Sequence, residues 1–148
     1  MTRTRAIAAA LLLAMCWLGL ARASLASQES FKVIVHPGNP ASIVERDFLR
    51  DAYLKKATNW PDGSAIRPID LVGKLPIREQ FISEVLGKTP AQLRSYWTQR
   101  IFSGLGVPPP EADTAQAAIR YVLTNKGSVA YVPAHVDTGG AKVVGLQR

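Results

Sequence analysis

The sequence predicts an α/β domain with a small central sheet flanked by helices. Short runs of β-branched residues alternate along the chain with longer runs whose apolar residues recur at helical spacing. Glycine, proline and asparagine separate most of these runs, as they do where secondary-structure elements end. Two of the helical runs also have the capping-box pattern of a helix start, in which serine or threonine is followed three residues later by glutamate or glutamine.

The first predicted strand is 31–35, a short β-branched run. The loop 36–40 contains two prolines and a glycine, so it ends the strand. Ser42 and Glu45 have capping-box spacing, and they predict the start of the first helix. The residues expected to face the core from this helix are Phe48, Leu49, Ala52 and Tyr53.

Residues 59–64 predict a turn, and 66–71 predict a second strand. Pro68 cannot donate a hydrogen bond to a neighbouring strand, so this strand is expected at an edge of the sheet. The second helix is expected to begin near Pro76, because proline suits the first helical position, and to end at Gly87. Its expected core residues are Ile77, Phe81, Ile82, Val85 and Leu86.

The third helix is predicted to run from Thr89 to about Phe102. Thr89 and Gln92 form the second capping-box pattern, and Pro90 stands just inside the helix. The glycine- and proline-rich stretch 103–110 then predicts an irregular connection. The expected core residues of this helix are Leu93, Trp97 and Ile101.

The last helix is predicted to open at Asp113, with Gln116 three residues later. After Gly127, the run 128–132 predicts a strand, and 143–146 predicts another. Strands and helices therefore alternate through most of the chain, which is why an α/β domain is expected. The apolar residues of the last helix are Ala115, Ala118, Ile119, Val122 and Leu123.

Residues 1–26 have the pattern of a secretory signal peptide. Arginines precede the apolar run 6–21, and small residues that suit cleavage follow it, with one option ending at Ala26. The run is shorter than the roughly 20 apolar residues that span a bilayer, so we expect no stable membrane span and release into the periplasm. Cleavage would also remove Cys16, the single cysteine, and leave 27–148 as one domain without disulfides.

The charge of the chain narrows the choice of partners. The net charge is +7, from 18 basic and 11 acidic residues. Removal of the signal takes away three arginines and no acid, so the net charge falls to +4. A moderate positive charge suits an anionic ligand or an anionic partner surface. Nucleic acid is not expected as a partner, because there is no clustered run of arginine and lysine with interleaved aromatic residues.

The sequence carries no motif of catalysis or metal binding. His36 and His135 are the only histidines, and neither has an acidic residue at the spacing of a metal site. There is no Gly-x-Ser-x-Gly elbow, no Gly-Lys-Ser/Thr phosphate loop and no paired-carboxylate pattern. We therefore expect a protein that is not an enzyme and that holds neither a metal nor a cofactor.

Two motifs carry a resemblance to a known family. Trp60-Pro61-Asp62-Gly63 follows the first predicted helix, and Lys126-Gly127-Ser128-Val129-Ala130-Tyr131-Val132 leads into a late strand. In this order they resemble the second lobe of the phosphate-binding proteins that serve ABC importers. The resemblance implies one lobe of a type II periplasmic binding protein, with a small anion such as phosphate as ligand and an ABC transporter as partner. It covers nearly all of 27–148 but only about half of the family's fold.

The family's anion-binding loop is not kept. In the family, an Arg-x-x-Gly-Ser-Gly-Thr loop holds the anion with backbone N–H groups and hydroxyls at a helix N-terminus, where the macrodipole favours negative charge. Counting back from Phe81 by the family's spacing puts Leu71 in place of the arginine. Leu75, Pro76 and Ile77 take the places of serine, glycine and threonine. We therefore expect phosphate binding by the isolated monomer to be weak or absent.

Four residues remain as candidates for ligand binding. Lys74 and Arg78 flank the start of the second helix, and Arg67 lies on the preceding strand. The charged groups of Lys74 and Arg78 could replace the lost hydroxyls with charge-assisted hydrogen bonds, although both residues are equally natural as surface charges. Asn39 follows the first strand, where doubly wound sheets usually place ligands, but a turn role between two prolines is its simpler interpretation.

Two functional hypotheses follow. The first is a periplasmic solute-binding domain, reduced to one lobe, that holds a small anion or supplies it to a transport system. The second is an envelope protein–protein interaction module that has kept the fold and lost the ligand. A single lobe cannot enclose a ligand, so high affinity would require two chains to meet face to face as a homodimer. A purely structural envelope domain would have neither ligand nor partner.

Overall fold

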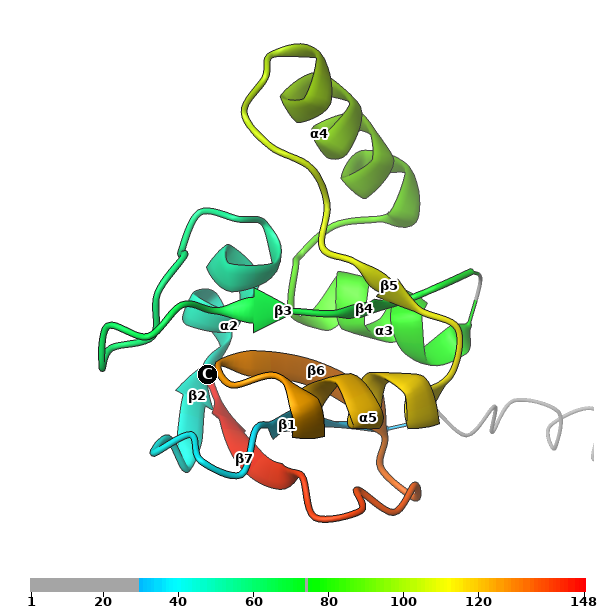
Figure 1. Ribbon diagram of the computed structural model, residues 1–148. Coiled ribbons are helices and arrows are strands. Elements are labelled where there is room, and N and C mark those ends of the chain that lie inside the picture. Colours follow the sequence, from blue (N-terminus) through cyan, green and yellow to red (C-terminus); the bar gives the residue numbers. More distant parts are fainter. Residues whose placement is uncertain (1–29, 74) are drawn as a thin grey trace, which may run out of the picture.

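A five-stranded mixed sheet forms the centre of the protein (Figure 1). The computed structural model describes residues 30–73 and 75–148, so the predicted signal peptide, 1–26, lies outside the described residues. The strands of the sheet lie in the order β2-β7-β1-β6-β3. Their bounds are β1 Phe31–Val35, β2 Ile43–Glu45, β3 Arg67–Pro68, β6 Ser128–Pro133 and β7 Lys142–Gln147.

β1 and β6 are the buried middle of this sheet. β1 pairs antiparallel with both of its neighbours, so that Val33 lies opposite Tyr131 of β6 and Val144 of β7. β2 and β3 form the two edges and run parallel to β7 and β6. The edge position of β3 confirms the expectation drawn from Pro68.

Helices cover both faces of the sheet, and no helix of the described ranges is long and apolar enough to cross a bilayer. On one face, the hydroxyl of Ser128 donates to the carbonyl oxygen of Val122 in α5 at 3.1 Å. Tyr131 of the same strand points to the opposite face, toward α2 and α3, because side chains alternate along a strand. The bounds of these helices are α2 Arg46–Tyr53, α3 Pro76–Glu84 and α5 Ala115–Thr124.

The face toward α2 and α3 holds an aromatic cluster. The ring of Phe81 stacks on the ring of Tyr131, with centroids 3.8 Å apart and an interplanar angle of 7°. Tyr53 and Phe31 meet the Phe81 ring edge-on, with centroids 4.8 and 5.5 Å away. Phe81 is 1% exposed, and the other apolar residues predicted for this helix are also buried, although the helix ends at Glu84 and Val85 and Leu86 follow it. This part of the predicted core is therefore confirmed.

A second, two-stranded sheet lies beside the first. β4 (Asp70–Leu71) pairs in parallel with β5 (Glu111–Ala112). The predicted strand 66–71 is therefore divided: β3 joins the main sheet, and after Ile69 the chain leaves it to pair with β5. β5 was not predicted, because a two-residue strand after three prolines has no alternating pattern of its own.

The first helix begins later than Ser42 and Glu45 predict. Residues Ile43–Glu45 form β2, and α2 begins at Arg46, with Glu45 as an N-cap residue whose side chain makes no capping hydrogen bond. The β-branched residues of this segment extend beside β7 instead, where Val44 is buried. Pairing with the sheet thus overrides the local capping pattern.

α4 (Pro90–Phe102) projects away from the sheet (Figure 1). Its predicted capping box is confirmed: Thr89 Oγ1 accepts from the N–H of Gln92 at 3.2 Å, and Gln92 Oε1 accepts from the N–H of Thr89 at 2.8 Å. The prediction that Ile101 is a core residue is wrong, because the last turn extends beyond the body of the protein and leaves this side chain 51% exposed. The buried residues of α4 are Leu93 and Trp97.

The last helix, α5, begins one residue later than Asp113 predicts. Thr114 is the N-cap residue, and its Oγ1 accepts from the N–H of Ala117 at 3.1 Å. Threonine and aspartate are both good N-cap residues, so neighbouring candidates cannot be separated by residue type alone. The buried residues of this helix are Ala118, Ile119 and Val122, as predicted.

Candidate functional site

The predicted anion loop lies between β4 and α3. Leu75 is the N-cap residue of α3 without a side-chain capping bond, and Pro76 takes the first helical position, where it has no N–H. The N–H groups of Arg78 and Glu79 both donate to the carbonyl oxygen of Leu75, at 2.9 and 3.1 Å. Lys74 lies outside the described residues. An anion at this helix start would therefore find neither a capping hydroxyl nor these two N–H groups.

Two residues of the predicted anion loop belong to the core. Leu71 is 2% exposed and Ile77 is 3% exposed. Full burial of a leucine or isoleucine side chain stabilises a protein by about 1.5–3 kcal/mol, which a serine or threonine would not provide. The altered loop positions therefore have a packing role.

Arg78 forms an ion-pair cluster with two carboxylates. Its guanidinium donates to Asp70 Oδ2 at 2.9 and 3.2 Å and to Glu111 Oε1 at 3.3 Å. Register pairing of β4 with β5 places these two acids side by side. Burial lowers the pKa of Arg78, but the charge and hydrogen bond of Asp70, with smaller contributions from Tyr131 and Glu111, raise that pKa above its ordinary value. Arg78 therefore stays positively charged, and the carboxylates of Asp70 and Glu111 already balance this charge.

Asp70 is the centre of this cluster. Its Oδ1 accepts from the hydroxyl of Tyr131 and from the N–H of Leu71, the latter at 2.8 Å. Burial raises the pKa of the Tyr131 hydroxyl, and the charge of Asp70 raises it further, so this hydroxyl stays protonated and donates. The neighbouring Tyr53 hydroxyl donates to the carbonyl oxygen of Ile69 at 2.9 Å, and burial raises its pKa as well. The network joins α2, β4 and β6 under the start of α3.

A groove opens beside the cluster, between α4 and the two-stranded sheet. Its volume is about 390 Å³. The charged residues of its lining are two acids and two bases, namely Asp70, Glu111, Arg78 and Arg94. Its apolar lining includes Leu93, Trp97, Ile101 and Pro108. The charges of the four lining side chains thus sum to zero.

Arg67 and Asn39 do not line this groove. Arg67 is an exposed residue of the edge strand β3. Asn39 lines a separate hollow of about 200 Å³ that also includes Lys126, and its Oδ1 accepts from the N–H of Ala41 at 2.9 Å, as in a turn. Of the candidate residues that the structure describes, the groove therefore includes Arg78 alone.

Three residues of the groove were missed: Asp70, Glu111 and Arg94. Asp70 stands inside the predicted strand 66–71, and an acid in a buried strand requires a partner, so this position could have indicated the pair with Arg78. Glu111 gave no such signal, because β5 itself was not predicted. Arg94 has the sequence context of any exposed helix residue.

The two family motifs meet at one point of the structure. Trp60 Nε1 donates to the carbonyl oxygen of Gly127 at 2.9 Å, and we call this the Trp60/Gly127 contact. Gly127 has a φ of +78°, and a Cβ there would collide with the carbonyl oxygen of Ala65. Asp62 accepts from the hydroxyl and the N–H of Ser64, at 2.6 and 2.9 Å, which lowers the pKa of Asp62. The first motif therefore forms a turn, and the second supplies the carbonyl oxygen that holds this turn against the sheet.

The chemistry that this arrangement offers is binding. Arg78, Arg94 and the two acids can hydrogen-bond to a small polar solute, and the groove wall can cover its apolar part. Within 30–73 and 75–148, no group of three or more His, Cys, Asp or Glu side chains is placed to hold a metal ion.

Comparison with known proteins relates the chain to solved structures only. No family model matches the sequence, and no curated protein matches it. A phosphate ABC transporter substrate-binding protein with bound phosphate from Clostridium perfringens is 20% identical, with a TM-score of 0.61 over 78% of this chain. An ABC-type phosphate transport receptor from Vibrio cholerae is 17% identical, with a TM-score of 0.60 over 78% of this chain. PstS from Borrelia burgdorferi is 10% identical, with a TM-score of 0.60 over 80% of this chain.

This chain spans less than half of each of these structures: 44%, 45% and 47% of their lengths. The match is to one lobe of the binding-protein fold, which confirms the predicted fold class. At these identities the likeness concerns the fold alone. The ligand and partner of this chain must be argued from its own residues.

Proposed function

We propose that this chain is an exported, non-catalytic, solute-binding-type domain, related to the phosphate ABC transporter substrate-binding proteins and carrying a degenerate anion loop. Its fold is one lobe of that class, and the solved structures of the fold are described as substrate-binding proteins or transport receptors. The pattern of residues 1–26 supports export to the periplasm. An ABC transporter is the class of partner that this proposal implies.

The observation that carries the proposal is the groove beside α3. It lies at the helix start where the resemblance places the ligand loop, and Arg78 and Arg94 line it. Asp70 and Glu111 lie in the same lining and oppose these charges. A solute held there would be small and polar, with phosphate as a weak ligand.

Weak phosphate binding follows from the partners that are missing. Leu71, Leu75 and Ile77 stand where the family has a charged or hydroxyl ligand. Each lost polar partner costs about 1–3 kcal/mol, and two or three such losses convert micromolar binding into millimolar binding or none. Any remaining anion affinity is proposed to depend on Lys74 and Arg78.

A second candidate function rests on the neutralised state of Arg78. The ion pairs with Asp70 and Glu111 use hydrogen-bond donors of the Arg78 guanidinium. If no donor remains for a ligand, the chain is an envelope protein–protein interaction module that has kept the fold and lost the solute. Two chains that meet face to face would be one form of such a module.

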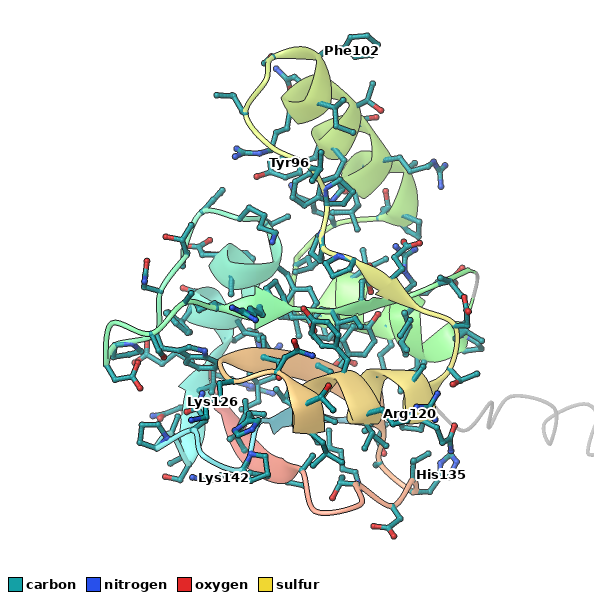
Figure 2. The ribbon with its side chains drawn as sticks, viewed as in Figure 1. Tyr96, Phe102, Arg120, Lys126, His135 and Lys142 are labelled. Atoms are coloured by element: carbon teal, nitrogen blue, oxygen red, sulfur yellow. The ribbon has the colours of Figure 1, made fainter. Side chains whose placement is uncertain are left out.

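An NMR titration distinguishes the two functions. The isotope-labelled chain from Ser27 onward is titrated with phosphate and, separately, with sulfate. For a solute-binding domain, amide shifts should move with millimolar midpoints and cluster around Arg78, Arg94 and Glu111. Replacement of both Lys74 and Arg78 by alanine should remove these shifts. The control Arg120→Ala lies on α5, across the sheet from α3, and should leave them unchanged (Figure 2).

Shifts scattered over the surface, or no shifts with either anion, would contradict the solute-binding proposal and favour the interaction module. A double variant whose amide shifts collapse to a narrow range in the absence of anion would be unfolded, and the single variant Lys74→Ala then takes its place. An unchanged midpoint in that variant would remove Lys74 from the site.

Export is tested separately. Mass spectrometry of the protein purified from periplasmic extracts should find a new N-terminus near Ser24 or Ser27, because small-residue cleavage options precede both. An intact N-terminus in the membrane fraction, or a lipid on Cys16, would contradict the proposed export and release.

A further inference from the structure

Exposed apolar side chains gather at the tip of α4. Seven large apolar side chains of the described residues are exposed, and four of them lie between 101 and 107. Phe102 is the most exposed, at 87%, and Figure 2 shows its ring at the far end of the projecting helix. Single exposed apolar residues are ordinary on a protein surface, but a cluster at one projecting point marks an interaction site. The tip residues are Ile101, Phe102, Leu105 and Val107.

The tip has a fixed shape. The guanidinium of Arg100 donates to the carbonyl oxygen of Leu105 at 2.7 Å, and the N–H of Leu105 donates to the carbonyl oxygen of Arg100 at 2.9 Å. Gly104 supplies the positive φ of +67° that this turn requires. Apolar groups held in place lose little conformational entropy when they are covered.

The segment that carries the tip has charged residues of one sign only. Residues 85–110 include no aspartate or glutamate, although the whole chain has 11 acidic residues. The same segment includes three basic residues, Lys88, Arg94 and Arg100. Lys88 and Arg100 both lie over the ring of Tyr96, at 5.6 and 5.5 Å from its centroid. We call the three basic residues of this segment the stem; Arg94 of the stem also lines the groove with Asp70 and Glu111, which belong to other segments.

We propose that the tip of α4 is a docking surface for an anionic phospholipid bilayer. The four apolar side chains enter the boundary of the acyl region, and the cations of the stem lie at the level of the phosphates. The match is one of charge and polarity: hydrocarbon meets the apolar tip, and anionic headgroups meet a segment without acids. The proposal concerns reversible attachment and does not rest on solute binding.

The shape of the tip favours a bilayer over a protein partner. Phe102 projects from the far end of α4 (Figure 2), and although Ile101 borders the groove, the other three tip residues are not part of its lining. These exposed side chains suit insertion into a surface that deforms around them. Recognition of a bilayer requires apolar area and positive charge, both of which the tip and stem provide.

Sedimentation with lipid vesicles tests the proposal. The apolar run 6–21 would itself bind lipid, so the experiment uses the chain from Ser27 onward, which includes the whole described core. The protein should sediment with vesicles of phosphatidylglycerol and phosphatidylcholine, much less with phosphatidylcholine alone, and less as salt is added. Replacement of Phe102 and Leu105 by serine should lower the partition coefficient about tenfold or more. Arg94→Gln should lower it about fivefold.

The matched control replaces two exposed apolar residues far from the tip. Ile43 is 59% exposed and Val143 is 50% exposed, and replacement of both by serine should leave partitioning unchanged. Failure of the wild-type chain to bind anionic vesicles, or equal loss of binding in tip and control variants, would overturn the proposal. A concentration-dependent dimer in analytical ultracentrifugation that disappears in the tip variant would overturn it too, by assigning the tip to a second copy of the chain.

Discussion

The Trp60/Gly127 contact and the start of α3 both correspond to motifs of the resemblance to phosphate-binding proteins, but their residues contribute to the structure in different ways. At the first, the indole hydrogen bond and the positive φ of Gly127 hold a turn against the sheet. At the second, Leu71 and Ile77 are buried apolar residues at positions where the resemblance leads one to expect anion ligands. Arg78, the nearby cation of the helix start, is bound to carboxylates of this chain.

At both places the residues contribute to the fold, whatever the protein binds. The Trp60/Gly127 contact joins two segments 67 positions apart, so its loss would affect folding whatever the protein binds. The loop at α3 sits on a helix start that packs through its apolar side, so its polar groups can change without loss of the core.

Phe81→Ala should have the largest effect on stability. Phe81 stacks on Tyr131 and contacts Tyr53 and Phe31, so its truncation leaves a cavity and should cost about 3–5 kcal/mol of unfolding free energy. Chemical denaturation measures this, with Ser83→Ala, at an exposed position of the same helix, as a control within about 0.5 kcal/mol. An unchanged midpoint for Phe81→Ala would show that α3 does not pack as described.

Arg78→Met sharpens the comparison at the α3 start. It leaves Asp70 with a buried charge and without its cation, so unfolding free energy should fall by about 2–3 kcal/mol. Arg94→Met is the control, because Arg94 lies in the same groove with an exposed side chain, and it should change stability by less than about 0.5 kcal/mol. Equal effects in denaturation would refute the structural role of Arg78.

Trp60→Phe should have a smaller effect. It removes the indole donor, but the carbonyl oxygen of Gly127 still accepts from the N–H of Arg67 at 3.0 Å, so the cost should be about 1–2 kcal/mol. Lys126→Ala, at the exposed neighbouring position, is the control for thermal unfolding. A loss as small as in Lys126→Ala would mean that the contact does not stabilise the turn.

Most of the fold could be predicted because its local signals agree with its tertiary structure. Thr89 and Gln92 cap α4, as their spacing predicts. The apolar residues of α3 that recur at helical spacing, Phe81 among them, face the core. The errors occur where long-range contacts decide. Ser42 begins no helix because β7 pairs with the next three residues, and Ile101 is exposed because nothing in helical spacing shows where a helix leaves the body.

The candidate site could be predicted only in part. Arg78 was found from its position at the helix start, but its acidic partner Glu111 is 33 residues away and is brought near by β5, which has no sequence signal. The neutral charge balance of the groove therefore required the structure. Arg78 and Arg94 alone would indicate an anion site, but Asp70 and Glu111 line the same groove and balance their charge.

Isothermal titration calorimetry of the chain from Ser27 onward with phosphate tests the central claim most directly. The opposed charge of Arg78 and the apolar residues at the loop positions predict no measurable binding heat at micromolar concentrations, and a dissociation constant in the millimolar range or weaker. A monomer that binds phosphate with a micromolar dissociation constant would contradict the account.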